Sequence, residues 1–292
     1  MAVSLFALLP HHALSRFMGW LAERRWGIGT RWGIRWFIRH YAVDMSEALV
    51  EDYRQYPTFN AFFTRQLKAN ARPLADSRNA IISPMDGFVS ALGTLQGDDL
   101  LQAKGKHYRL ADLLGGDQEE AERFRNGLFF TGYLAPKDYH RVHMPVTGRL
   151  LKMIYVPGRL FPVHFTSVSR VSGLFNRNER LICLFDTAVG PMAIILVGAF
   201  LVGNITTVWT RRIRRTNQRR VLPIDENTKN KVLQRGQEMG YFKMGSTVIV
   251  LFQAKAIQWE RVLAVHGRVK MGGAIAQPLF CEEKHGSEKG ET

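Results

Sequence analysis

Three short stretches of the sequence combine reactive side chains with glycine or proline. The first contains Asp86, the second contains His140 and His143, and the third is the step from Gly245 to Ser246. An aspartate, a histidine and a serine can form a hydroxyl nucleophile that an imidazole activates and a carboxylate orients. Each stretch also has a plain structural interpretation, because Asp before Gly is common in turns and a three-residue Gly-Ser-Thr motif is weak.

Metal binding is the other chemistry that two neighbouring histidines suggest. No cluster of carboxylates or cysteines completes a site with His140 and His143, and Cys183 and Cys281 have no metal-ligand spacing. We therefore expect no metal. Two cysteines without a disulfide framework also favour a reduced, cytosolic chain.

The elements that must position these residues are mostly strands. Short apolar and β-branched runs, separated by glycine, proline and aspartate, begin near residue 81. Strands this numerous favour a mainly β body over alternating βαβ units. The expected class is α+β, a mainly β body with N-terminal amphipathic helices that dock on the membrane surface. The expected strands are 86–90, 148–156, 181–185, 192–209, 247–252 and 262–269, with a helix at 110–124.

The N-terminal part carries a helical pattern instead. Helices are predicted at residues 14–22 and 29–41, and Thr58 is expected to cap a short helix. In the second helix three arginines recur every four residues beside tryptophans, which is typical of a helix in the headgroup region of a membrane. An amphipathic helix packed on the protein's own core is the alternative. The residues concerned are Arg31, Arg35, Arg39, Trp20, Trp26, Trp32 and Trp36.

The net charge of +15 indicates a polyanionic partner, either nucleic acid or an anionic membrane surface. Six of the arginines fall within residues 210–221, in an expected loop without interleaved aromatics, which does not favour base stacking. No run is long and apolar enough to span a bilayer, so membrane contact is expected from the surface.

The sequence resembles the prokaryotic-type phosphatidylserine decarboxylases over nearly its whole length. One departure is Met244, where the family usually has leucine, and this exchange roughly keeps the side-chain volume. The stretches that carry the resemblance are 56–65, 84–87, 101–105, 138–145, 154–158, 178–180, 236–240 and 245–247.

The resemblance implies self-processing at the Gly245–Ser246 bond. The Ser246 hydroxyl would attack the Gly245 carbonyl, and elimination with loss of ammonia would leave a pyruvoyl group in place of Ser246. The family assigns His143 as base and Asp86 as its orienter. The pyruvoyl ketone is the Schiff-base site and electron sink, so neither metal nor pyridoxal phosphate is expected. His143 is also the expected proton donor, and His140 is expected to hold the substrate carboxylate or headgroup.

The same resemblance implies the partners. Phosphatidylserine would be converted to phosphatidylethanolamine and carbon dioxide, in phospholipid biosynthesis, by a peripheral protein on the cytoplasmic face of the bacterial inner membrane. A large chain (1–245) and a small chain (246–292) would associate, as a homodimer of such pairs. The positive charge would then serve an anionic membrane surface and not nucleic acid. We expect a membrane-associating helical segment at 1–66, a catalytic domain at 67–281 and a polar tail at 282–292.

Two rival hypotheses remain open from the residues alone. A hydrolase could use Asp86, His143 and Ser246 as a stable triad, which predicts one intact chain. A basic membrane- or RNA-binding β module would leave Ser246 as a simple turn residue, so that Ser246→Ala would change nothing.

Overall fold

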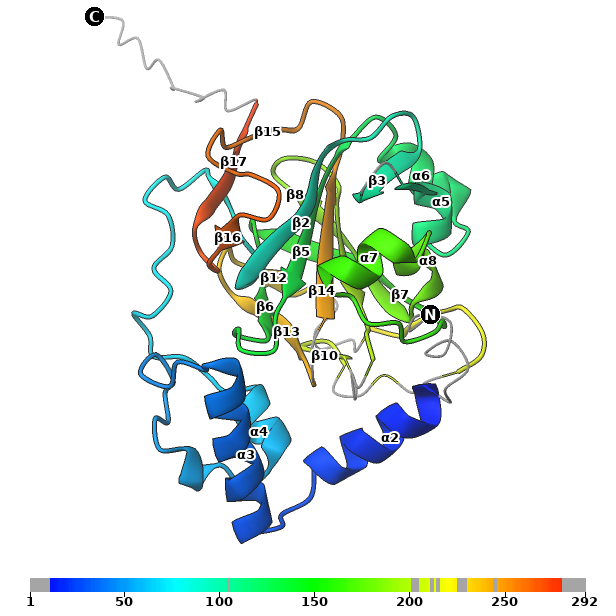
Figure 1. Cartoon of the computed structure of the whole chain (residues 1–292). Coiled ribbons are helices and arrows are strands. Elements are labelled where there is room, and N and C mark those ends of the chain that lie inside the picture. Colours follow the sequence, from blue (N-terminus) through cyan, green and yellow to red (C-terminus); the bar gives the residue numbers. More distant parts are fainter. Residues whose placement is uncertain are drawn as a thin grey trace, which may run out of the picture.

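The computed structural model describes residues 11–103, 106–200, 205–210, 213, 216–224, 230–243 and 246–279 (Figure 1). Gly245, Cys281, the expected tail at 282–292 and part of the arginine-rich segment lie outside the described residues.

An antiparallel sheet forms the body of the protein, with β14 near its centre (Figure 1). Among the described residues its order is β11-β7-β8-β9-β14-β5-β2-β16, and β12 adds to β7. The prediction of a mainly β body is therefore confirmed. The strands are β2 (Gly87–Thr94), β5 (Leu128–Leu134), β7 (Gly148–Val156), β8 (Arg180–Thr187), β9 (Met192–Val197), β11 (Arg220–Val221), β12 (Val232–Leu233), β14 (Ser246–Phe252) and β16 (Arg268–Val269).

Both faces of this sheet are buried, which explains why its central strands are continuous apolar runs. Along β14, Val248 and Val250 enter one hydrophobic core, whereas Ile249 and Leu251 enter the other. Two small sheets supply the first core: β1 (Ile81–Ile82) with β17 (Ala274–Pro278) and β15 (Ile257–Trp259), and β10 (Ile205–Thr207) with β13 (Glu238–Phe242) and β6 (Arg141–His143).

Short helices and a hairpin cover the opposite face and complete the second core. They are α5 (Leu110–Leu113), α6 (Gln118–Arg123), α7 (Phe165–Arg170), α8 (Leu174–Arg177) and the hairpin of β3 (Asp99–Ala103) with β4 (Lys106–Arg109).

The N-terminal helices lie beside the body with a small core of their own (Figure 1). The predicted helices are confirmed as α2 (His11–Ala22) and α3 (Ile28–Tyr41), and α4 (Phe59–Phe63) follows the short turn η1 (Tyr53–Gln55). Thr58 caps α4 as predicted, because its hydroxyl accepts a hydrogen bond from the Ala61 N–H at 3.1 Å. No helix of the described residues is both long enough and apolar enough to cross a membrane.

Three predicted elements were wrong in extent. The helix expected at 110–124 is two helices, because Gly115 and Gly116 take positive φ angles of 75° and 86° between them. The strand expected at 192–209 is split into β9 and β10. Only Arg268–Val269 of the run expected at 262–269 forms a strand, and Val262 is 90% exposed.

Candidate active site

The antiparallel pairing brings the three candidate stretches to one end of the central sheet. Ser246, the first residue of β14, pairs with Leu134, the last residue of β5. Phe88 of β2 pairs with Tyr133 of β5, so Asp86, directly before β2, lies at the same end. The chain leaving β5 then carries both candidate histidines. Residues that are far apart in the sequence thus meet because alternate strand ends share one edge.

His143 ends β6 as a buried imidazole with both ring nitrogens hydrogen-bonded. Its Nδ1 lies 2.8 Å from the carbonyl oxygen of Gly236, and its Nε2 lies 3.1 Å from the Tyr139 hydroxyl oxygen. Because a carbonyl only accepts, Nδ1 carries the proton and the Tyr139 hydroxyl donates to Nε2. Burial lowers the pKa of His143 below its ordinary value, so the ring is neutral near pH 7. A neutral ring with a lone pair at Nε2 is the form that a general base requires.

Asp86 is buried in an ion-pair cluster. Its carboxylate accepts hydrogen bonds from Nε of Arg72 at 2.9 and 3.0 Å and from the Met271 N–H at 2.8 Å. Arg72 also pairs with Glu47, at 2.7 Å. Two carboxylates and one guanidinium therefore share a site. The side chains of Arg72 and Asp86 are only 7% and 4% exposed, so little water reaches their ion pair.

Asp86 and His143 are linked through the backbone and through charge. The N–H of His143 donates to the carbonyl of Pro84 at 2.8 Å, which ties β6 to the segment before β2. The negative charge of Asp86 acts to raise the pKa of His143, against the effect of burial. No hydrogen bond joins their side chains within the described residues. Orientation of His143 by Asp86 therefore stays a prediction, and the hydrogen bond that orients the ring in this structure is the one to Gly236.

His140 has a fully buried ring with one unpaired nitrogen. Its Nδ1 donates to the carbonyl of Asp138 at 2.8 Å, while Nε2 has no partner among the described residues. Burial, and next the positive charge of Arg65, lower the pKa of His140 to about 3. The ring centroid lies 4.0 Å from that of Phe63 in α4. His140 is thus a neutral acceptor at the contact between the body and α4.

Ser246 is fully buried, and its hydroxyl has no hydrogen-bond partner among the described residues. Leaving a buried hydroxyl unpaired has a free-energy cost. The hydroxyls of Tyr108, Thr131, Thr206 and Thr247 also have no partner in the described part of the chain, so it is the place of Ser246 beside the Gly245 bond that distinguishes it. The predicted buried strand after the Gly-Ser step is confirmed, since every residue of β14 is buried. A hydroxyl without a partner is free to act as a nucleophile.

Sequence reasoning missed three residues that hold the candidate groups. Tyr139 and Gly236 fix the tautomer of His143, and Arg72 neutralises Asp86. Tyr139 lies next to His140 in a stretch already singled out, and that position was the available signal. Gly236 likewise lies in the stretch 236–240 that carries the family resemblance. Arg72 had no such signal, because it lies outside every stretch singled out and its partners are distant in the chain.

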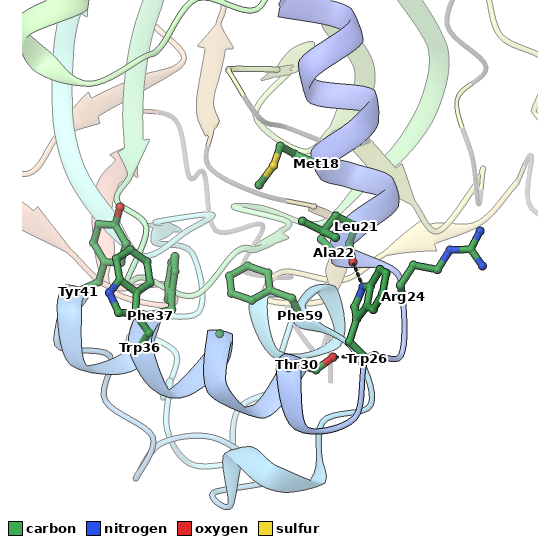
Figure 2. Close-up of a pocket in the computed structure, with 12 residues that line it drawn as sticks. Met18, Leu21, Ala22, Arg24, Trp26, Thr30, Trp36, Phe37, Tyr41 and Phe59 are labelled. Carbon is green, nitrogen blue, oxygen red and sulfur yellow. Dashed lines mark hydrogen bonds between the residues drawn. The ribbon is translucent and has the colours of Figure 1, made fainter.

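A cavity lies between α2 and α3, and its lining includes none of Asp86, His140, His143 and Ser246. It is an apolar cavity of about 670 Å³ in which Phe59 of α4 and Met18 and Leu21 of α2 face the aromatic side of α3 (Figure 2). Nε1 of Trp26 closes one end by donating to the carbonyl of Leu21 at 3.4 Å. The cavity and the exposed tryptophans together give this segment a large apolar surface.

Metal chemistry has no support in the described part of the chain. No group of three histidine, cysteine, aspartate or glutamate side chains there is arranged to hold a metal ion.

A buried neutral imidazole, and a buried hydroxyl without a partner among the described residues, at one end of one sheet are a combination suited to an enzyme site. Comparison with known proteins defines the class. A family model described as phosphatidylserine decarboxylase matches residues 59–277, and one described as PSD matches residues 1–42. The chain belongs to the phosphatidylserine decarboxylase family.

Curated relatives match almost end to end. A phosphatidylserine decarboxylase proenzyme of Coxiella burnetii is 52% identical over 274 residues, which cover 94% of this chain and 97% of the relative. Proenzymes of the same name from Ectopseudomonas mendocina and Bordetella avium are 51% and 50% identical, over 91% and 93% of this chain and 93% and 92% of their own lengths.

Proposed function

We propose that this protein cleaves itself between Gly245 and Ser246 and then decarboxylates phosphatidylserine to phosphatidylethanolamine, using the pyruvoyl group formed from Ser246. The observation that carries the proposal is the buried hydroxyl of Ser246, which has no partner in the part of the chain that the structure describes. It lies at the start of β14, at the sheet end that also holds the two histidines and Asp86. Family membership supports it, because the relatives are named proenzymes.

Cleavage begins when Oγ of Ser246 attacks the carbonyl carbon of Gly245 and its proton passes to a base. The peptide C–N bond then breaks, which leaves an ester and a free amine on residue 246. Removal of the Cα proton of residue 246 expels the carboxylate of Gly245. Uptake of water and release of ammonia leave the ketone. No external cofactor is needed, and Ser246 fits this change because its hydroxyl has no competing partner among the residues that the structure describes.

His143 is the proposed base, because it is neutral and carries its lone pair at Nε2. In the decarboxylation the pyruvoyl group supplies an electron sink for the pair left when carbon dioxide departs. The same imidazole then supplies the proton that the substrate carbon requires. His140, neutral and buried, holds the substrate close to this centre. Asp86 contributes negative charge that favours the protonated His143 formed in each step.

The experiment is intact-mass measurement of freshly purified protein. Wild type is expected to yield chains of 245 and 47 residues, with the smaller chain lighter than its encoded sequence by the loss of ammonia. Ser246→Ala is expected to remain one chain of 292 residues without a reactive carbonyl. An unsplit wild-type chain with no activity on phosphatidylserine would overturn the proposal. That result would favour the stable-triad hydrolase or the binding module.

We also propose that the N-terminal helices dock on an anionic membrane surface from the cytoplasmic side, as a peripheral anchor. On α3, Trp32 is 70% exposed and Trp36 is 52% exposed, beside exposed Arg35 and Arg39. Buried Phe37 faces inward. A basic and aromatic outer face of this kind suits the interface between headgroups and acyl chains.

Vesicle sedimentation tests the docking. Wild type is expected to bind vesicles of phosphatidylglycerol and phosphatidylethanolamine at low salt, and Trp32→Ala with Trp36→Ala is expected to reduce binding. Equal binding of both proteins would contradict this surface. Light scattering of the processed protein checks the homodimer that the family resemblance implies.

A further inference from the structure

Arg65, two residues after α4, is a buried cation with few hydrogen-bond partners, and its guanidinium lies 5.5 Å from the centroid of the Phe62 ring. The residue is 5% exposed, and Nη2 donates to the carbonyl of Lys137 at 3.0 Å. Its Nε has no hydrogen-bond partner, and no carboxylate lies within ion-pair distance among the described residues. A buried charge without a counterion has a high free-energy cost.

Other arginines with largely buried side chains have more hydrogen-bond partners. Arg72 pairs with Asp86 and Glu47, and Arg141 pairs with Glu238 at 2.7 Å. Arg180, 2% exposed, donates to four backbone carbonyls. Arg65 is the exception, which indicates that its partner comes from outside the described chain.

Asn60 of α4 adds a second uncompensated group on the same helix. It is 4% exposed, and neither atom of its side-chain amide is hydrogen-bonded within the described residues. Asn60 and Phe63 are three residues apart and so share a face of α4, and Phe63 touches His140 at 4.0 Å between ring centroids. The positive charge of Arg65 acts on His140 as well. Arg65, Asn60 and His140 therefore all lie at the junction between α4 and the candidate active site.

Two of the unpaired atoms at this junction, Nε of Arg65 and Nδ2 of Asn60, are donors that require an acceptor. The positive charge of the guanidinium favours an anionic acceptor. We propose that Arg65 and Asn60 bind the phosphodiester oxygens of the lipid headgroup, as specificity-determining residues for the reaction. This inference rests on the proposed function.

The phosphodiester fits this position better than the substrate's other anionic group. The carboxylate loses its negative charge as carbon dioxide forms, so a cation bound to it would stabilise the ground state more than the transition state. The phosphodiester keeps its charge throughout the reaction. A cation bound to the phosphodiester therefore lowers KM without raising the barrier, and its loss should appear in KM while kcat is kept.

The test compares Arg65→Gln with wild type on two substrates. The first is short-chain phosphatidylserine in detergent micelles, and the second is a diacylglycerol ether of serine that lacks the phosphate. Arg65→Gln is expected to raise KM for phosphatidylserine about thirtyfold, equivalent to about 2 kcal/mol, with kcat unchanged. On the phosphate-free substrate the two proteins are expected to have equal kcat/KM. Arg149→Gln, which removes an exposed charge paired with Asp186, is the matched control and should behave as wild type.

Three results would overturn the inference. They are an unchanged KM for phosphatidylserine, an equal loss on both substrates, or a loss confined to kcat. If Arg65→Gln fails to fold or to cleave itself, Asn60→Ala and Arg65→Lys give the same comparison with smaller changes. Arg65→Lys keeps the positive charge but loses the Nε donor. Its KM for phosphatidylserine is therefore expected to lie between those of wild type and Arg65→Gln. Failure of the proposed function is distinguishable, because wild type itself would then be unsplit or inactive.

Discussion

The hydroxyl of Tyr139 donates a hydrogen bond to Nε2 of His143, across 3.1 Å. The bond stabilises the neutral imidazole, since only the unprotonated nitrogen can accept it. It also occupies the lone pair that a general base uses. The first prediction follows from this contact.

Tyr139→Phe is expected to raise the pKa of His143, because a hydrogen bond to the neutral form disfavours protonation. A bond of about 1 kcal/mol corresponds to a shift of about 0.7 pH units. The low-pH limb of self-cleavage, followed by gel densitometry, should move upward by that amount. Tyr56→Phe is the control, because it removes a hydroxyl bonded to the carbonyl of Val50 at 2.8 Å and no histidine contact. Equal profiles for Tyr139→Phe and wild type would contradict the prediction.

Arg72→Gln is expected to destabilise the fold by about 3 kcal/mol, because it leaves the buried carboxylate of Asp86 without its cation. Glu47→Gln should cost less than about 1 kcal/mol, since Glu47 is the more exposed carboxylate of the cluster. Urea unfolding in a Ser246→Ala background, where the chain stays uniform, measures both. A larger effect for Glu47→Gln would show that the cluster is organised around the other carboxylate.

His140 is expected to make the free energy of unfolding fall as the pH is lowered. The unfolded imidazole takes up a proton near pH 6.5, whereas the folded one does so only near pH 3. Above about pH 6.5 the group has no effect on stability. Between these values the unfolded state binds one more proton. The free energy of unfolding therefore falls by up to about 1.4 kcal/mol for each unit by which the pH is lowered. Unfolding free energies at pH 7, 6 and 5 should therefore decline less steeply for His140→Gln than for its parent, and parallel slopes would refute the assignment.

Substitution of Gly87 by any residue with a side chain is expected to destabilise the fold. Its φ is 147°, and a Cβ there would overlap the carbonyl oxygen of Tyr133. Gly87→Ala should cost about 3 kcal/mol or more. Gly33 in α3 has no atom within 4 Å of the Cβ position, so Gly33→Ala should stabilise by about 0.5–1 kcal/mol. Thermal unfolding of both variants measures the two changes in stability. Changes of the same sign for Gly87→Ala and Gly33→Ala would contradict the prediction.

The two chains expected after cleavage should stay together. The small chain would contribute β14, which pairs with β5 on one side and β9 on the other, and also β17, which pairs with β1. Gel filtration of processed protein in buffer should give one peak with both chains, and only denaturant should separate them. Release of the small chain in buffer would contradict the pairing.

The sequence predicted those elements whose signal is local. The apolar run of β14, the four-residue arginine spacing of α3 and the cap of α4 all depend on neighbours within a few positions, and all three elements are present. The single helix expected at 110–124 was wrong, because Gly115 and Gly116 in its middle take positive φ angles that interrupt a helix.

The contacts of the candidate site could not be predicted in this way. Gly236 and His143 are 93 residues apart, and Met271 and Asp86 are 185 apart. No periodicity links such positions, because strand order in an antiparallel sheet is decided by the packing of the whole chain. The reactive side chains could be identified from their types, but the groups that hold them required the fold.

The central position of β14 has a consequence for when the protein matures. During synthesis β5 and β9 emerge first, and the place between them stays open until residues 246–252 have been added. The sheet end that holds the candidate groups cannot assemble until β14 has been made, because β14 is its middle strand. Self-cleavage would then have to wait for this strand, and a chain that stops before residue 246 would lack both the middle strand and the reactive serine.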